Sequence, residues 1–136
     1  MDAPADLAAR VRAILDVPLH RHLGLTFDGH EPGVAHAHFD AGAAHEAFGG
    51  IHGGVLYALL DAVCMLALLP TLPGGRHAVT HDLHVSMMRP VRPGALCRLE
   101  GRVARAGRTL AFIDGIARVD GQVVASARVT KSLTDA

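Results

Sequence analysis

The sequence is poor in aromatic residues: it contains no Trp, one Tyr and four Phe, which together make up 4% of the chain. Proteins that bind single-stranded nucleic acids stack the bases on aromatic side chains, so this composition disfavours that class. The formal net charge is +0, which removes the electrostatic attraction that draws proteins to nucleic acids and anionic membranes. We therefore expect no nucleic-acid partner and no membrane partner.

Cysteine is almost as scarce. The two cysteines, Cys64 and Cys97, both fall in apolar segments, so we expect reduced core thiols and not a disulfide framework. The acidic start of the chain lacks the basic region of a secretory signal. The one long apolar stretch includes Asp61 and ends at Pro70, so it is too short and too interrupted to span a bilayer comfortably. A cytoplasmic protein is the expectation.

Hydrophobic residues, in contrast, make up 50% of the 136 residues, which is enough for one domain with its own core. We expect this domain to cover residues 1–136, with residues 1–22 as a helical lead-in. Periodicity and turn signals predict a helix at 6–15, a connection at 20–25, strands at 25–29 and 34–39, a loop at 40–51, a long helix from about Gly53, and strands at 77–88, 95–106, 109–119 and 123–133. This order predicts an α+β fold, an antiparallel sheet wrapped around one long buried helix.

The predicted central helix carries the most informative residue. From Val55 to Leu69 every residue is apolar or nearly so except Asp61. A helix that is apolar on all sides is buried, and a lone carboxylate inside it is costly unless it is paired or hydrogen-bonded. The pattern therefore indicates a functional Asp61. The alternative is a structural Asp that is satisfied by a neighbouring backbone group or hydroxyl.

The start of this helix offers a second kind of site. The first N–H groups of a helix have no internal partner, so after His52 the amides of Gly53 and Gly54 could hold a carbonyl oxygen or an oxyanion. Gly53 and Asp61 are separated by roughly 12 Å of helix, too far to act on one carbonyl. If they act together, two copies of the helix must run antiparallel. This predicts a dimer with two composite sites.

These residues carry a family resemblance. The pattern Gly49-x-x-His52-Gly53-Gly54, followed by Asp61, resembles the hotdog-fold acyl-CoA thioesterases of the phenylacetate-pathway (PaaI-like) type. The run from Thr80 to Pro90 is similar to the central strand of that family, and the likeness extends over about residues 23–133. The resemblance implies a hotdog fold, hydrolysis of an acyl-CoA or aryl-CoA thioester, no cofactor, and a homodimer or homotetramer.

The resemblance also implies roles for individual residues. Asp61 would act as general base on water or as nucleophile, and both options stay open. Gly53 would donate its N–H to the thioester oxygen, while His52 would orient the loop. The hydroxyl of Thr80 would help to hold the attacking water; otherwise it is an ordinary strand threonine.

Substrate contacts follow from the same resemblance. Besides the catalytic group, the residues expected to bind the substrate or coenzyme A are Gly54, Phe48, Gly49, Arg89, Arg105 and Arg108, with Arg92 nearby. Arginine binds the phosphate groups of coenzyme A well, although each arginine could equally be a solvated surface charge.

Glu46 departs from the family pattern. Relatives commonly carry Asn or Gln at this position, where the amide orients the water or the substrate carbonyl. An ionised carboxylate cannot donate a hydrogen bond. Glu46 would therefore be a second acid or base, or else it would weaken the site, with His45 as a substitute donor.

Ten histidines raise the question of a metal site. His36 and His38 share one face of a predicted strand, but no ligand set at zinc spacing accompanies them, so we expect no metal. Two other functions compete with hydrolysis. One is a non-catalytic acyl-CoA-binding module, which Glu46 favours and Asp61 disfavours. The other is a hotdog hydratase or dehydratase, whose residue spacing this chain fits poorly. The acyl group is left open.

Overall fold

The structure, a computed structural model, describes residues 4–135. Its helices are α1 (Pro4–Leu15), α2 (Pro18–Leu23) and α3 (Gly53–Leu68), with short 3-10 turns η1 (Ala43–His45) and η2 (Leu69–Thr71). Its strands are β1 (Thr26–Glu31), β2 (Val34–Asp40), β3 (Glu46–Ala47), β4 (Gly50–Ile51), β5 (Arg76–Met87), β6 (Leu96–Ala106), β7 (Leu110–Val119) and β8 (Gln122–Asp135).

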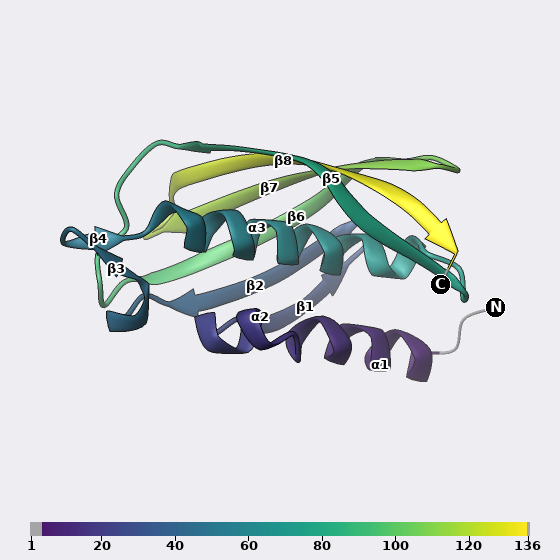
Figure 1. The fold of residues 1–136 in the computed structure, drawn as a ribbon, viewed down its shortest axis with the longest axis horizontal. Coiled ribbons are helices and arrows are strands. Elements are labelled where there is room, and N and C mark those ends of the chain that lie inside the picture. Colours follow the sequence, from purple (N-terminus) through teal and green to yellow (C-terminus); the bar gives the residue numbers. More distant parts are fainter. Residues whose placement is uncertain (1–3, 136) are drawn as a thin grey trace.

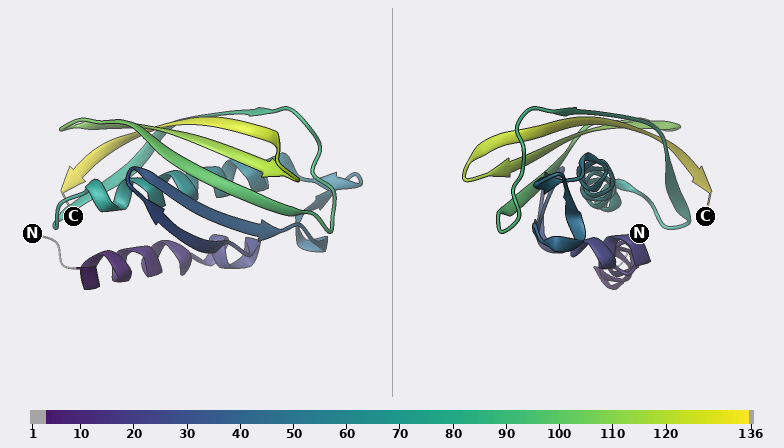
Figure 2. Two further views of the ribbon diagram at one scale, coloured as in Figure 1. Left: turned by 180° about the vertical axis from the view of Figure 1, so that it is seen from behind. Right: turned by 60° about the vertical axis from the view of Figure 1, so that its left-hand side comes forward.

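Six strands form one antiparallel sheet in the order β1-β2-β6-β7-β8-β5. The sheet curls around α3, while α1 and α2 lie on the side of α3 away from β7 and β8 (Figures 1 and 2). Strand residues alternate between the two faces, as in β7, where Ala111, Ile113 and Ala117 are fully buried and face the helix. The predicted α+β hotdog fold is confirmed.

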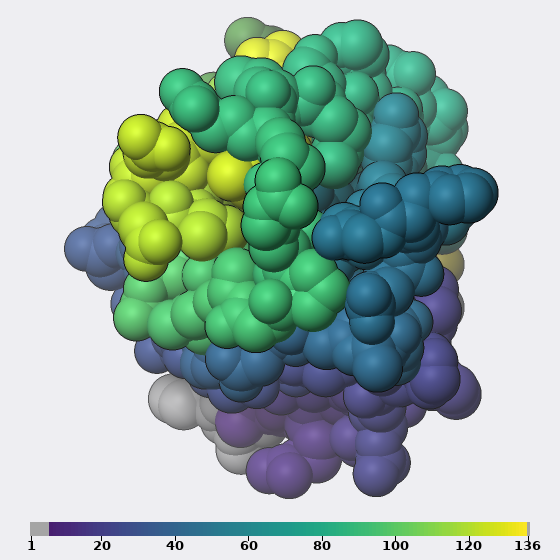
Figure 3. Space-filling model, turned by 90° about the vertical axis from the view of Figure 1, so that its left-hand side faces the viewer, coloured from purple at the N-terminus to yellow at the C-terminus, as the bar shows by residue number. Residues whose placement is uncertain are grey.

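A short helix and a short hairpin were not predicted. The segment expected to be a connection at 20–25 contains α2, which begins at Pro18 and ends at Gly24 with φ of 81°. Proline at the first turn and a left-handed glycine after the last are typical of helix ends. The loop at 40–51 contains the β3–β4 hairpin, which projects from one end of the molecule (Figure 3). Its turn has positive φ at both Phe48 (53°) and Gly49 (84°).

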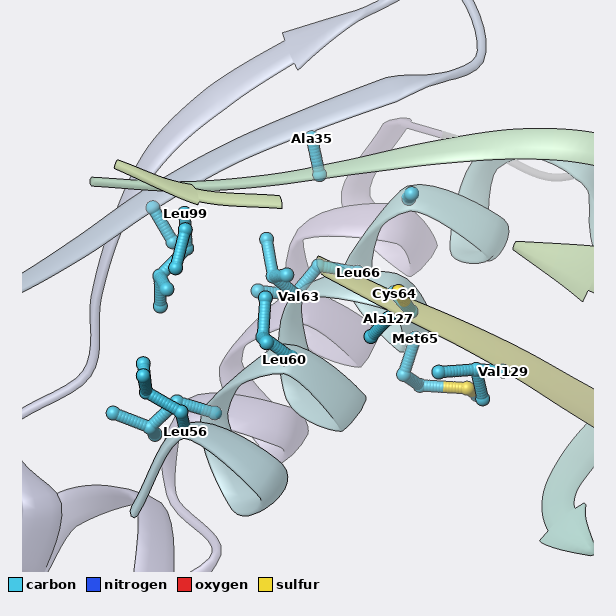
Figure 4. Close-up of a cluster of buried hydrophobic side chains, with 14 of the residues drawn as sticks. Ala35, Leu56, Leu60, Val63, Cys64, Met65, Leu66, Leu99, Ala127 and Val129 are labelled. Carbon is cyan, nitrogen blue, oxygen red and sulfur yellow. The ribbon is translucent and has the colours of Figure 1, made fainter. Parts of the chain in front are cut away.

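The core lies between α3 and the sheet. Leu60, Val63 and Leu66 of the helix are fully buried, and Leu60 and Val63 extend toward Leu99 of β6 (Figure 4). Burying a leucine side chain stabilises a fold by about 1.5–3 kcal/mol, so this row of leucines and valines fixes α3 against the sheet.

A pair of glycines lets the helix approach closely. Gly101 of β6 and Gly115 of β7 are cross-strand neighbours facing α3. A Cβ atom on Gly101 would lie 2.5 Å from the carbonyl oxygen of Val63, and one on Gly115 would lie 3.1 Å from the Cys64 sulfur. The backbone of α3 therefore rests directly on the sheet here, one turn after Asp61.

We expect Gly101→Ala to destabilise the protein by about 1–3 kcal/mol, because the new methyl group meets helix backbone that cannot rotate away. Urea unfolding followed by circular dichroism measures this. Gly42→Ala is the matched control, since an added Cβ at Gly42 has no atom within 4 Å. Equal stability of the two variants would contradict the close helix–sheet contact.

The prediction that α3 is buried on all sides is wrong along one stripe. Gly54 and Tyr57 are exposed, Ala58 is half-buried, and the Asp61 side chain keeps 33% of its surface exposed. These residues recur at helical spacing on one face. Within one chain, the sheet leaves this face of the helix uncovered.

The apolar run is also longer than we expected. α3 and η2 together give 19 residues, Gly53–Thr71, a length and composition that could cross a membrane. In this structure 67% of this apolar stretch is buried inside the protein, where it forms the helix around which the sheet curls.

Candidate functional site

Asp61 and Thr80 come together in the structure. Asp61 lies in the middle of α3, and Thr80 lies on β5, the edge strand beside it. The Thr80 hydroxyl donates a hydrogen bond to Asp61 Oδ1 over 2.7 Å. A β-bulge at His81 shifts the pairing of β5 with β8, so that Thr80 and, further along, Leu83 both face inward. Without this extra residue the alternation would not direct both side chains to the helix.

Lys131 of β8 completes this cluster, and sequence reasoning missed it. Its Nζ donates to Thr80 Oγ1 over 2.6 Å and to Asp61 Oδ1 over 3.3 Å. Its exposed fraction is only 4%. The available signal was its place in the alternation of β8, where Val129, Lys131 and Leu133 fall on one face; the pairing with Thr80 depends on the bulge. We use "carboxylate cluster" below for Asp61, Thr80 and Lys131.

The start of α3 forms a separate amide site. His52 is the N-cap residue, and its Nδ1 accepts the Gly54 N–H over 2.8 Å. This hydrogen bond holds the His52 ring at the first turn of α3, where it orients the start of the helix. The N–H of Val55 donates to the His52 carbonyl oxygen. Within residues 4–135, the Gly53 N–H donates to no acceptor. This amide is therefore available to an oxygen from outside the chain, at the positive end of the helix dipole.

The carboxylate cluster and the amide site lie on the same helix but not at the same place. Eight residues separate Gly53 from Asp61, which corresponds to roughly 12 Å along the axis. Both lie next to the uncovered stripe of α3 formed by Gly54, Tyr57 and Ala58. One chain alone therefore cannot bring both groups to a single carbonyl.

The hairpin residues lie beside the amide site. Glu46 is exposed at the start of β3 and pairs with Ile51 of β4 in the backbone register. Phe48 and Gly49 form the exposed tip. The suggestion that His45 substitutes as a donor is wrong: it is buried, its Nδ1 accepts the Gly42 N–H, and its Nε2 contacts the Leu23 carbonyl oxygen at 2.9 Å. Both ring nitrogens are thus engaged inside the chain.

The predicted coenzyme A arginines do not form one group within the chain. Arg89 follows β5 and its N–H donates to the Val124 carbonyl oxygen. Arg105 and Arg108 lie at the opposite end, where Arg76 at the start of β5 donates to the Arg108 carbonyl oxygen. The 12 residues of β5 span roughly 36 Å between these ends. All three arginines are exposed.

The cysteines offer no competing nucleophile. Cys64, one turn after Asp61, and Cys97 are buried and unpaired, as predicted. Burial raises the pKa of the Cys64 thiol, and the nearby Asp61 charge raises it further. Burial raises the pKa of Cys97 to about 12. Both groups are therefore neutral thiols near pH 7, and the thiol form is a poor nucleophile.

Two of the three histidines on the β1–β2 hairpin contact carboxylates. His36 contacts Glu31 at 2.6 Å and His38 contacts Asp28 at 2.8 Å. Among residues 4–135, no group of three His, Cys, Asp or Glu side chains lies in an arrangement that could hold a metal ion.

Comparison with known proteins gives the family. Residues 48–126, more than half of the chain, match the thioesterase superfamily. Human acyl-coenzyme A thioesterase 13 is 34% identical over 89 residues, which are 64% of this chain and 63% of the human protein. This chain therefore matches less than two thirds of the length of that relative.

Solved structures of similar proteins point to the same family. A phenylacetic acid degradation-related protein from Ralstonia eutropha has a TM-score of 0.83 at 29% identity, covering 93% of this chain and 98% of that chain. A mutant of the phenylacetic acid degradation protein PaaI from Thermus thermophilus has a TM-score of 0.78 at 28% identity, covering 85% and 97%. The predicted likeness to PaaI-like thioesterases is thus confirmed, and the chain belongs to the thioesterase superfamily.

Proposed function

We propose that this protein is an acyl-CoA thioesterase that works as a homodimer or a dimer of dimers in the cytoplasm. Water adds to the thioester carbonyl carbon, the carbon–sulfur bond breaks, and the products are a carboxylic acid and the thiol of coenzyme A. Asp61 either removes a proton from this water or attacks the carbonyl carbon itself; in the second route the thiol leaves, a mixed anhydride with Asp61 forms, and water hydrolyses it to release the acid. The Gly53 N–H of the partner subunit receives the oxyanion. The resemblance of the chain to acyl-CoA thioesterases supports this reaction.

One observation carries the proposal. Within residues 4–135, the Gly53 amide has no acceptor and Asp61 Oδ2 has no hydrogen-bond partner, and the two groups lie toward opposite ends of the uncovered face of α3. Two such helices running antiparallel would bring each amide opposite the other carboxylate. The open edge of β5 supports this arrangement, because β8 is its only neighbour in the described sheet and exposed Val79 and Met87 lie along it. Exposed strand edges readily pair with a second copy.

The acyl group is a separate part of the proposal. The likeness to phenylacetic acid degradation proteins favours an aryl or arylacetyl thioester as the substrate of this chain, whereas the human relative is described only as an acyl-coenzyme A thioesterase. In an antiparallel dimer, arginines from opposite ends of the two sheets would come to the same side, so Arg89 of one subunit and Arg108 of its partner are the proposed phosphate contacts.

Thiol release from a panel of acetyl-, hexanoyl-, benzoyl- and phenylacetyl-CoA tests this function. We expect release of coenzyme A from at least one thioester, with kcat/KM in the range of ordinary enzymes, about 10⁴ M⁻¹s⁻¹ or higher. Sedimentation measured in parallel should give a dimer or tetramer. A fully active monomer would contradict the composite site, while the absence of thiol release from every member would contradict the activity.

The second candidate is an acyl-CoA-binding module without turnover, and Glu46 favours it. A carboxylate stands where relatives carry an amide, and it is exposed beside the amide site. Binding of a non-hydrolysable thioether analogue, together with no thiol release, would support this candidate.

A further inference from the structure

Lys131 is an unusual residue in this chain. The sequence has 13 Lys and Arg residues, and Lys131 is the only lysine among them. The surface therefore takes its positive charge from arginine, and the single ammonium group lies inside, at 4% exposure. A buried charge is costly unless it is paired and hydrogen-bonded, so this position demands an explanation.

Lys131 lies on the buried, helix-facing side of the sheet. Lys131 faces α3 on the same side of β8 as Val129, and its cross-strand neighbours are Ala111 of β7 and Thr80 of β5. A methionine of similar length would fill such a place without any charge. Replacing buried ion pairs by apolar residues is often neutral or stabilising, so packing alone does not explain the ammonium group.

The hydrogen bonds of the carboxylate cluster have a defined direction. An ammonium group only donates, so the Thr80 hydroxyl oxygen accepts from Lys131 over 2.6 Å. The hydroxyl proton of Thr80 is then directed to Asp61 Oδ1 over 2.7 Å, and Lys131 reaches the same oxygen at 3.3 Å. Both donors thus converge on Oδ1. Within residues 4–135, Asp61 Oδ2 has no hydrogen-bond partner.

We propose that Lys131 is a positioning residue for the thioesterase reaction, acting through Thr80 and directly to hold Asp61 Oδ1, so that Oδ2 is the oxygen that faces water or the thioester carbon. The inference rests on the proposed function. Two donors fix the rotation of the carboxylate, and the ammonium charge stabilises its negative charge. Lys131 itself touches neither the substrate nor the reacting atoms.

Steady-state kinetics of Lys131→Met provides the first test. We expect kcat to fall about 10- to 100-fold, the range that loss of a charged hydrogen bond gives, while KM changes less than about twofold. Arg128→Met is the matched control, because it removes a positive charge from the exposed face of the same strand, where Arg128 pairs with Asp114 at 2.6 Å. The control should retain kcat.

Thr80 provides a second route if Lys131→Met fails to fold. Thr80→Val removes the bridging hydroxyl at equal size and should lower kcat about 10-fold, the loss of one hydrogen bond to a charged group. Thr80→Ser restores the hydroxyl and should recover most of the rate. In combination with Asp61→Asn, neither Lys131→Met nor Thr80→Val should lower the residual rate further.

A spectroscopic test does not depend on activity. Protein labelled with ¹³C-lysine gives one side-chain Cε signal, since Lys131 is the only lysine. This signal should shift in Asp61→Asn and in Thr80→Val but stay unchanged in Asp114→Asn. An unchanged signal in Asp61→Asn, or full kcat in a folded Lys131→Met enzyme, would overturn the role of Lys131 alone. A wild-type protein that hydrolyses no thioester would overturn the proposed function and the positioning role together.

Discussion

Replacing Asp61 by Asn is expected to reduce kcat/KM for thioester hydrolysis by about 10³-fold, within the range that loss of a general base produces. Asn has the same shape, and its side-chain oxygen can still accept from Thr80 and Lys131. An amide is neither a base nor a nucleophile, so the chemistry is lost while the contacts remain. Because 33% of the Asp61 side chain is exposed and Asn has the same size, we expect the substitution to create no cavity and no packing defect.

The measurement is thiol release with the best thioester of the panel, together with far-UV circular dichroism to verify folding. Asp82→Asn is the control, because Asp82 is an exposed carboxylate on the same edge strand as Thr80. It changes the net charge equally and should keep the wild-type rate. If Asp61→Asn retains more than about a tenth of the rate, the carboxylate has a structural role and another group must activate water.

The second large effect concerns a backbone amide, which ordinary substitutions cannot remove. Gly53→Pro is expected to lower kcat about 10²- to 10³-fold, as loss of one oxyanion donor does in other enzymes. Proline lacks the N–H but is well tolerated as the first residue of a helix, which is where Gly53 lies. His52 before it is already extended, with φ of −63° and ψ of 132°, the conformation that a following proline requires.

Gly53→Ala is the control for this variant, since it keeps the N–H and an added Cβ at this position has no atom within 4 Å. It should retain most of the activity. Mixing Gly53→Pro with Asp61→Asn subunits adds a further test of the composite site. Heterodimers would contain one site with both defects and one intact site, so activity should return toward half of the wild-type value per active dimer. No recovery after subunit exchange would contradict sharing of the site between chains.

The sequence was sufficient to predict the fold because long periodic segments dominate it. The apolar run around Asp61 and the glycine hairpin signals identify α3 and the four long strands, and the structure agrees within a few residues. Short elements were missed because two strand residues, as in β3, or six helical residues, as in α2, produce no periodic pattern. Helix α2 was still marked by Pro18 and Gly24 at its ends.

The candidate site was predicted only in part. Asp61 and Gly53 were predicted from the apolar helix and its glycine-rich start, and Thr80 from the family resemblance; the structure brings Asp61 and Thr80 into contact. Lys131 was missed because its partner depends on strand register, and the bulge at His81 shifts that register by one residue. The exposure along α3 was missed because apolar composition does not distinguish a face covered by the same chain from a face left open.

The single lysine has a consequence for chemical self-damage. Activated thioesters acylate free amines: the amine nitrogen attacks the carbonyl carbon, an amide forms and the thiol leaves. Guanidinium groups stay protonated and do not react in this way near neutral pH. This chain has one lysine, and it is 4% exposed. Apart from the N-terminal amine, its surface therefore presents no amine to the thioesters that the proposed reaction would bring to it, so the enzyme would resist acylation by its own substrate.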